Sequence, residues 1–139
     1  MRHIVITLLA ALMPMLAYAQ EWIELGSQDS QTWYIYSNIQ NEYGNHLVWT
    51  KITYDTPEAR KQAMNNYGVK YHVFEDRMLY YFNSEWSKIS LKSGSSYSKS
   101  GKVLNSFTSP YDEWQYITPE TIGESIRDAA KYIYESGNL

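Results

Sequence analysis

Cysteine is absent from the 139-residue sequence. This absence excludes disulfides, zinc ribbons, iron–sulfur clusters, cysteine nucleophiles and the lipidated cysteine of a bacterial lipoprotein. An excess of charge of one sign is lacking too, because 12 basic residues stand against 15 acidic ones and no block of like charges occurs. The sequence has neither the basic footprint of a nucleic-acid-binding protein nor an acidic tail, so we expect no nucleic-acid partner.

Long hydrophobic runs are also scarce. The one such run, residues 4–16, follows Arg2 and His3 and leads into Ala17-Tyr18-Ala19. This order of a basic start, an apolar stretch and small residues is typical of a cleaved secretory signal, which we assign to residues 1–19. The run is shorter than the roughly 20 residues that a membrane-spanning helix needs. We therefore expect an exported domain at 20–139, periplasmic, secreted or at the cell surface, without a lipid anchor or a transmembrane segment.

Aromatic residues are abundant, with 5 Trp, 14 Tyr and 3 Phe. Together with β-branched residues they form short segments separated by turn-forming Gly, Asn, Asp and Ser, a pattern typical of strands. A tight hairpin is predicted at 98–102, closed by Gly101. The segments expected to be strands are Trp22–Leu25, Thr32–Ile39, His46–Tyr54, Met78–Phe82, Trp86–Ser93 and Val103–Phe107.

Two segments carry helix signals. Thr56-Pro57-Glu58 supplies a cap residue, a first-turn proline and a first-turn acid, and Gly68 stands where a helix would end. Thr118-Pro119-Glu120 repeats this signature before an apolar stripe at helical spacing that includes Ile122, Ile126 and Ile133. The predicted fold class is α+β, a single domain in which about six antiparallel strands pack against a C-terminal helix.

The sequence offers little for catalysis. His46 and His72 lie on different predicted elements, with no second histidine or acid at ligand spacing on the same face, so ordinary packing or exposure is expected for both. The carboxylates are scattered, and those of the last helix form a solvated stripe. We therefore predict no enzymatic activity, no cofactor and no metal site.

One strand suggests a binding surface. Alternation along 86–93 places Ile89 and Leu91 on a core face and Trp86, Lys88, Ser90 and Lys92 on the other. A tryptophan beside two lysines could meet an anionic partner or a glycan. The simpler interpretation is that Trp86 packs under the C-terminal helix or on a neighbouring strand while the lysines protect a sheet surface.

Four segments, in order, resemble the surface-adhesin protein E family of Gram-negative bacteria. They are the aromatic strand 32–39, the Val-x-Trp strand 47–51, the Tyr-x-x-x-Gly-Lys-Val hairpin 97–106 and the Trp-x-x-Ile-x-Pro lead into the last helix, 114–124. The resemblance implies a compact antiparallel sheet packed on a C-terminal helix, and a non-enzymatic protein that binds host extracellular-matrix or serum proteins. It also implies that a basic stretch in the region of Lys88 and Lys92 takes part in binding.

An alternative function stays open. A cleaved signal without an anchor also suits a periplasmic accessory or structural protein that binds another component of the bacterial envelope. The partner is a protein or a glycan in either case. A homodimer is conceivable as well, because a small sheet leaves its edge strands unpaired.

Overall fold

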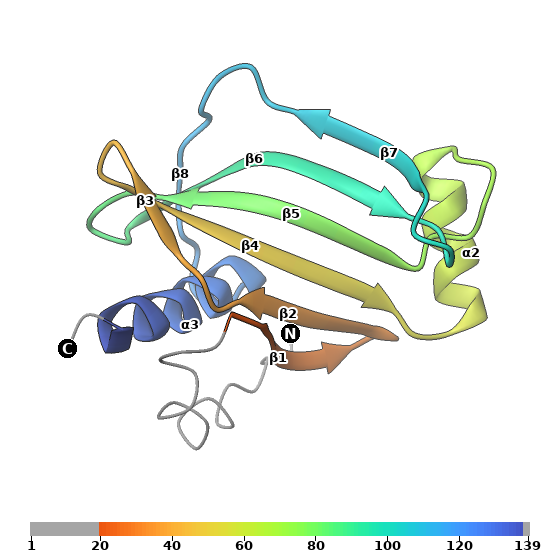
Figure 1. The fold of residues 1–139 in the computed structure, drawn as a ribbon, viewed down its shortest axis with the longest axis horizontal. Coiled ribbons are helices and arrows are strands. Elements are labelled where there is room, and N and C mark those ends of the chain that lie inside the picture. Colours follow the sequence, from red (N-terminus) through yellow and green to blue (C-terminus); the bar gives the residue numbers. More distant parts are fainter. Residues whose placement is uncertain (1–19, 138–139) are drawn as a thin grey trace.

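Strands predominate in residues 20–137, the part of the chain that the computed structural model describes (Figure 1). The predicted signal segment 1–19 lies outside the described residues. The strands are β1 (Trp22–Gln28), β2 (Gln31–Tyr36), β3 (Gln40–Glu42), β4 (Asn45–Tyr54), β5 (Glu75–Phe82), β6 (Lys88–Tyr97), β7 (Val103–Thr108) and β8 (Gln115–Tyr116). The helices are α2 (Pro57–Tyr67) and α3 (Ile122–Gly137).

All strand pairs are antiparallel, and the main path through the sheet is β1-β2-β4-β5-β6-β7. The two shortest strands lie off this path, β3 on β4 and β8 on β6. Short turns join β1 to β2, β5 to β6 and β6 to β7, whereas α2 lies in the connection between β4 and β5. The predicted α+β fold with an antiparallel sheet and a C-terminal helix is confirmed.

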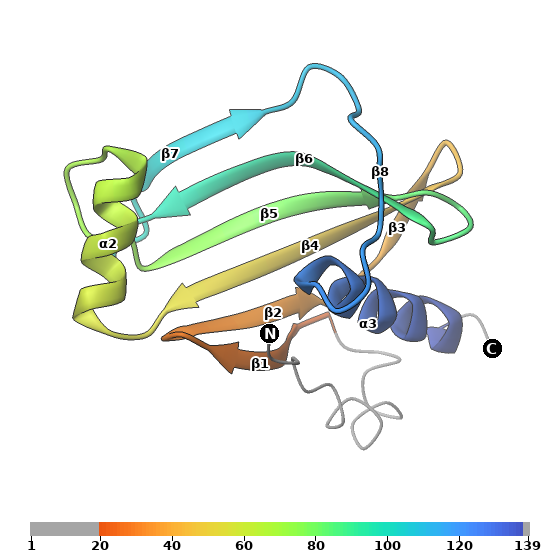
Figure 2. The same ribbon diagram turned by 180° about the vertical axis from the view of Figure 1, so that it is seen from behind.

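Helix α3 covers one face of the sheet (Figure 2). Its apolar stripe of Ile126, Ala129, Ala130 and Ile133 is buried against Ile23, Leu25, Ile35, Val48 and Phe82 from the strands. The helix begins where Thr121 Oγ1 accepts the Glu124 N–H at 3.3 Å and the Glu124 carboxylate accepts the Glu120 N–H at 2.8 Å. This reciprocal capping places the helix start three residues after the predicted signature at Thr118.

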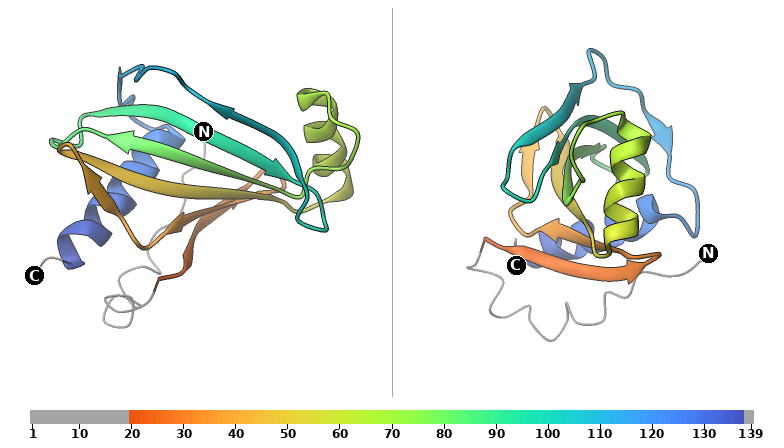
Figure 3. Two further views of the ribbon diagram at one scale, coloured as in Figure 1. Left: turned by 45° about the horizontal axis from the view of Figure 1, so that its top comes forward. Right: turned by 90° about the vertical axis from the view of Figure 1, so that its right-hand side faces the viewer.

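Helix α2 packs on a second, smaller core at the other end of the sheet (Figure 3). Thr56 caps it by accepting the Ala59 N–H at 3.1 Å, and Gly68 ends it in the left-handed conformation at φ 67°. Both features follow the sequence signature. Ala63 is the buried residue of this helix, in contact with a cluster that holds Ile52, Tyr54 and Val73.

The sheet departs from the predicted strands in the second half of the chain. The strand predicted at Trp86–Ser93 begins only at Lys88 and continues to Tyr97, through Gly94. Its start is delayed because the Asn83 side chain accepts the N–H groups of Ser87 at 2.8 Å and Lys88 at 2.9 Å, which extends the turn. The short strands β3 and β8 were not predicted, since β3 lies in a polar, turn-rich segment and β8 has only two residues.

Candidate functional site

The alternation along β4 divides the sheet into two faces. Val48, Thr50 and Ile52 are buried on the face that carries the helices. Trp49 and Lys51 point to the opposite face, which neither α2 nor α3 covers, and we call it the helix-free face. Because paired residues of antiparallel strands share a face, the register Tyr34–Lys51–Arg77 brings these three side chains into one row.

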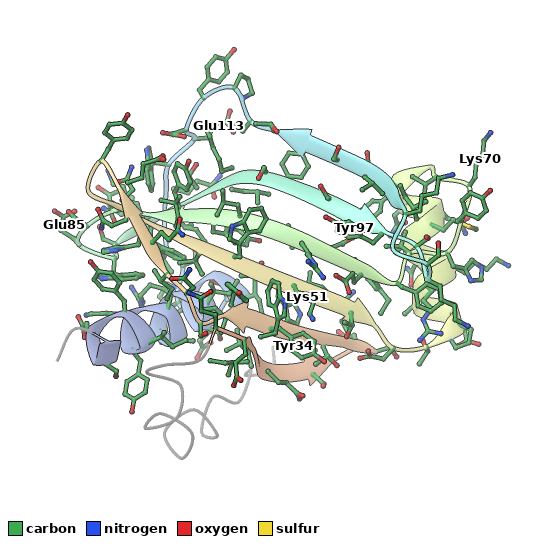
Figure 4. All side chains as sticks on the ribbon, in the orientation of Figure 1. Tyr34, Lys51, Lys70, Glu85, Tyr97 and Glu113 are labelled. Carbon is green, nitrogen blue, oxygen red and sulfur yellow. The ribbon has the colours of Figure 1, made fainter. Side chains whose placement is uncertain are left out.

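Aromatic rings surround the two cations of this row. Lys51 Nζ lies 4.7 Å from the ring centres of both Trp22 and Tyr34. The Arg77 guanidinium lies 5.5 Å from the rings of Trp22 and Tyr97. Trp22 also packs at 5.1 Å against Tyr36. The rings come from β1, β2 and β6, so the sheet register assembles the cluster from segments far apart in the sequence; Figure 4 labels Tyr34, Lys51 and Tyr97 among them.

The electrostatics of the two cations differ. Arg77 Nε donates to Glu75 Oε2 at 2.6 Å, so the guanidinium has a carboxylate partner on its own strand. Lys51 has no carboxylate within ion-pair distance among residues 20–137. Burial lowers the pKa of Lys51; Glu75 opposes this shift, and the positive charge of Arg77 adds to it. The Lys51 side chain is thus partly desolvated and without an ionic partner in the described part of the chain.

A cleft of about 580 Å³ lies on the helix-free face. Trp22, Tyr36, Trp49, Arg77 and Tyr97 line it from β1, β2, β4, β5 and the end of β6. Its remaining wall is rich in hydroxyl groups from the two strands at the far side of the sheet, namely Ser93, Ser95, Ser106 and Thr108. We call this feature, together with the adjoining Lys51 and Tyr34, the sheet cleft. It combines ring surfaces, hydroxyls and positive charge, the groups that a recognition site needs.

Gly94 allows a close contact between β6 and β7 on the face opposite the sheet cleft. A Cβ atom at this position would stand 2.7 Å from the Phe107 ring and 3.2 Å from the Met78 side chain, so only glycine allows Phe107 to lie this close to β6. Phe107 pairs with Gly94, Gly94 with Met78 and Met78 with the buried Thr50, so the Phe107 ring lies on the face that carries the helices, where it is 46% exposed. The glycine therefore permits a close strand-to-ring contact on the face of the sheet opposite the hydroxyl wall.

The structure corrects the placement of Trp86. The predicted outward row placed its side chain in solvent, but Trp86 is only 6% exposed and belongs to the main core. Its ring stacks on His46 at 4.0 Å with an interplanar angle of 6°, and Phe82 and Tyr134 complete the cluster. Trp86 adopts a left-handed conformation at φ 61° within the turn, before β6 begins, so strand alternation does not apply to it. Trp86 therefore packs beneath the C-terminal helix, as the simpler interpretation of the sequence stated.

Lys88 and Lys92 lie near the surface, each over a tyrosine ring. Lys88 Nζ lies 4.8 Å from the Tyr116 ring, and Lys92 Nζ lies 5.7 Å from the Tyr81 ring. Lys92 also forms an ion pair with Asp112 at 2.9 Å. Of the two predicted core residues, Ile89 packs on the main core, whereas Leu91 is 39% exposed. Ser90, predicted on the outer face, is instead buried, and β6 carries a bulge beside these residues.

The remaining polar groups of interest are structural in their surroundings. His46 is 4% exposed within the aromatic cluster, whereas His72 is exposed. Asp76, also buried, accepts hydrogen bonds from the hydroxyls of Tyr54 and Tyr67 at 2.5 Å and from Ser96 at 2.6 Å. This buried network joins the end of α2 to β4, β5 and β6. Within residues 20–137, no three His, Asp or Glu side chains gather as a metal site would need.

Sequence reasoning missed the sheet cleft although one of its signals was present. The alternation at 46–54 already placed Trp49 and Lys51 on one side of a strand. The other members come from β1, β2, β5, β6 and β7, and only the strand order brings them together. Arg77 precedes the strand predicted at Met78–Phe82, so it was not assigned to any face.

The family model described as surface-adhesin protein E matches residues 22–130. A search of the curated proteins finds no significant match to the chain. Among the described residues, neither helix has the length and apolar character to cross a membrane. The matched segment runs from the first residue of β1 into α3 and so contains the complete sheet with the sheet cleft. The chain therefore belongs to the surface-adhesin protein E family.

Proposed function

We propose that this protein is an exported, non-enzymatic binding protein that attaches to a host extracellular-matrix or serum protein through its helix-free face. Family membership supports an adhesin-like protein. The observation that carries the proposal is the sheet cleft, where rings, hydroxyls and two cations lie on the one sheet face that no helix covers. Export rests on the expected signal at residues 1–19, which lies outside the described residues.

The helix-free face has the composition of an interface centre. Tryptophan, tyrosine and arginine are the residues most often found where truncation weakens an interface strongly. Trp49 is 39% exposed and so can contact a partner without rearrangement of the sheet. The cations lie over rings that the register already fixes, which reduces the side-chain entropy lost when a partner binds.

The test uses the mature chain, residues 20–139, against a panel of immobilised matrix and serum proteins. Trp49→Ala combined with Lys51→Gln should weaken any binding that is found, because both side chains face the sheet cleft. The matched control is Lys61→Gln on the exposed surface of α2, which removes the same charge elsewhere. Binding that survives the double variant unchanged would place the partner on another surface.

Location distinguishes the alternative function. Protein released only by osmotic shock and bound to an envelope component would favour a periplasmic accessory role over contact with the host. Protein accessible on intact cells, together with binding to the host panel, would favour the adhesin role.

Lys88 and Lys92 stay a second candidate binding position. Substituting both with glutamate should weaken binding most at low ionic strength if they contact an anionic partner, since exposed charges act mainly on the association rate. A partner affinity that does not depend on these two lysines would leave the sheet cleft as the binding surface.

A further inference from the structure

We propose that the sheet cleft binds a polysaccharide chain that carries carboxylates but no sulfates, such as a chain containing uronic acid. The inference rests on the proposed function, because it assigns a ligand class to the same helix-free face. Three features of the cleft support it: exposed ring surfaces, a small number of positive charges and a wall of hydroxyl groups.

The ring surfaces suit sugars. One side of a pyranose ring presents mainly C–H groups, which pack on the faces of tryptophan and tyrosine. In the sheet cleft, Trp22 and Tyr36 pack against each other at 5.1 Å, and Trp49 lies beside them with 39% of its surface exposed. Such partly buried rings offer fixed apolar surface at low entropic cost. The described residues that line this cleft include no aliphatic side chains, which would favour a lipid chain instead.

The charge of the cleft selects an acidic ligand of low charge density. Lys51 has no ionic partner within residues 20–137, and Arg77 shares its positive charge with Glu75 at 2.6 Å. Glu24 of β1 pairs with Tyr34 of β2 and so adds a negative charge on the same face of the sheet. The cleft can therefore pair its few cations with carboxylates that are spaced apart along a ligand chain. A densely sulfated chain would find too few cations in the cleft, and a protein of net charge −3 would repel it.

The extent of the cleft favours the interior of a chain over a single terminal sugar. Its lining runs from Trp22 on β1 to Thr108 on β7, across the six strands of the main path. At the usual spacing between strands this crossing covers about 24 Å. Hydroxyls of Ser93, Ser95 and Ser106 stand along the far part of the path, where they can exchange hydrogen bonds with sugar hydroxyls.

The first test compares ligands with the parent protein, so it does not depend on any variant. The probes are a hexasaccharide of alternating glucuronate and N-acetylglucosamine, an uncharged hexasaccharide of N-acetylglucosamine, and a heparin hexasaccharide. Calorimetry should show binding of the glucuronate probe that is about tenfold or more tighter than that of the uncharged probe, as expected for a charge-assisted contact. Equal binding of the two, tighter binding of heparin, or no binding of the glucuronate probe would overturn the inference.

The second test assigns the contact to residues. Lys51→Gln and, separately, Trp49→Ala should each weaken binding of the glucuronate probe by about tenfold, while Lys61→Gln should leave it unchanged. Circular dichroism of each variant verifies the fold. An equal loss in all three variants, or none in the first two, would contradict the assignment to the sheet cleft.

A matched pair of surfaces separates this inference from the proposed function. A host matrix protein is presented either intact or after enzymatic removal of its uronate chains. Loss of binding on treatment supports the saccharide inference. Retained binding overturns it but preserves the adhesin role, and the absence of binding to both surfaces contradicts the proposed function itself.

Discussion

Truncation of Trp86 tests the core that the structure assigns to the β5–β6 turn. The indole stacks on His46 from β4 and contacts Phe82 from β5 and Tyr134 from α3. The Trp86 carbonyl also accepts a hydrogen bond from Arg127 Nη1 of α3 at 2.9 Å. Replacing Trp86 with alanine keeps this backbone contact but removes the ring that joins two strands and a helix.

The expected loss is large. Removing a buried tryptophan side chain lowers the free energy of unfolding by about 3–5 kcal/mol, because its transfer energy is lost and a cavity remains. For a domain of this length, the melting temperature should fall by about 10–20 °C. Trp86 has φ 61°, in the left-handed region of the backbone. This conformation costs an L-residue about 1 kcal/mol and costs glycine almost nothing. Trp86→Gly should therefore be at least as stable as Trp86→Ala, the reverse of the usual order in a strand or helix.

Urea denaturation followed by far-UV circular dichroism measures both variants without depending on tryptophan fluorescence. Each folded variant should bind the partner of the helix-free face as the parent protein does, because Trp86 lies in the core beneath α3. A loss below about 1 kcal/mol in Trp86→Ala would show that the ring is not part of a packed core. A folded Trp86→Ala variant that has lost binding would instead restore Trp86 as a contact residue.

Three further predictions concern buried polar groups. Asp76→Ala should lower the free energy of unfolding by about 3 kcal/mol or more, because three hydroxyl donors lose their carboxylate. Tyr67→Phe should lower it by about 1 kcal/mol, because only one hydrogen bond is removed. Equal losses of the two variants in urea denaturation would contradict the network. Burial lowers the pKa of His46 below its usual 6.5. The free energy of unfolding should therefore decrease as the pH falls below about 6.5, because there the unfolded chain takes up the proton and the folded chain does not. His46→Gln should reduce this pH dependence. Burial raises the pKa of Tyr80 to about 12, and burial together with Asp76 raises the pKa of Tyr67 to about 12. The melting temperature should therefore fall as the pH increases from about 10 to about 12, because the tyrosines lose their protons more readily in the unfolded chain. A constant melting temperature over that range would refute this prediction.

The sequence predicted the fold well where local signals agree with the tertiary structure. Alternation at 46–54 gave β4 almost to the residue, and the Thr56 and Gly68 signals bounded α2. The stripe of Ile126, Ala129, Ala130 and Ile133 gave the buried face of α3. In each case the same residues determine the backbone conformation and the buried contacts, so a local pattern carries the required information.

The candidate site could not be predicted in the same way. Alternation holds only inside a strand, and Trp86 lies in a turn that the Asn83 side chain extends by accepting two backbone N–H groups. Its indole therefore points into the core although the periodicity of 86–93 places it outside. The sheet cleft depends instead on the register, which pairs Lys51 with Arg77, brings Trp22 within reach of both cations and brings Tyr97 within reach of Arg77.

The helix-free face also explains why aromatic residues can remain uncovered in a chain of modest charge. An exposed ring surface of this size would favour aggregation, yet Lys51 lies over the rings of Trp22 and Tyr34 and keeps its ammonium among them. The cation thus reduces the apolar surface that water meets and at the same time holds a charge in a partly desolvated place. The proposed carboxylate ligand would use that charge without reorganising the cleft, and its ring surface would cover Trp49. The contact that shields the rings in the free protein is therefore the same one that the proposed acidic, ring-bearing ligand would use.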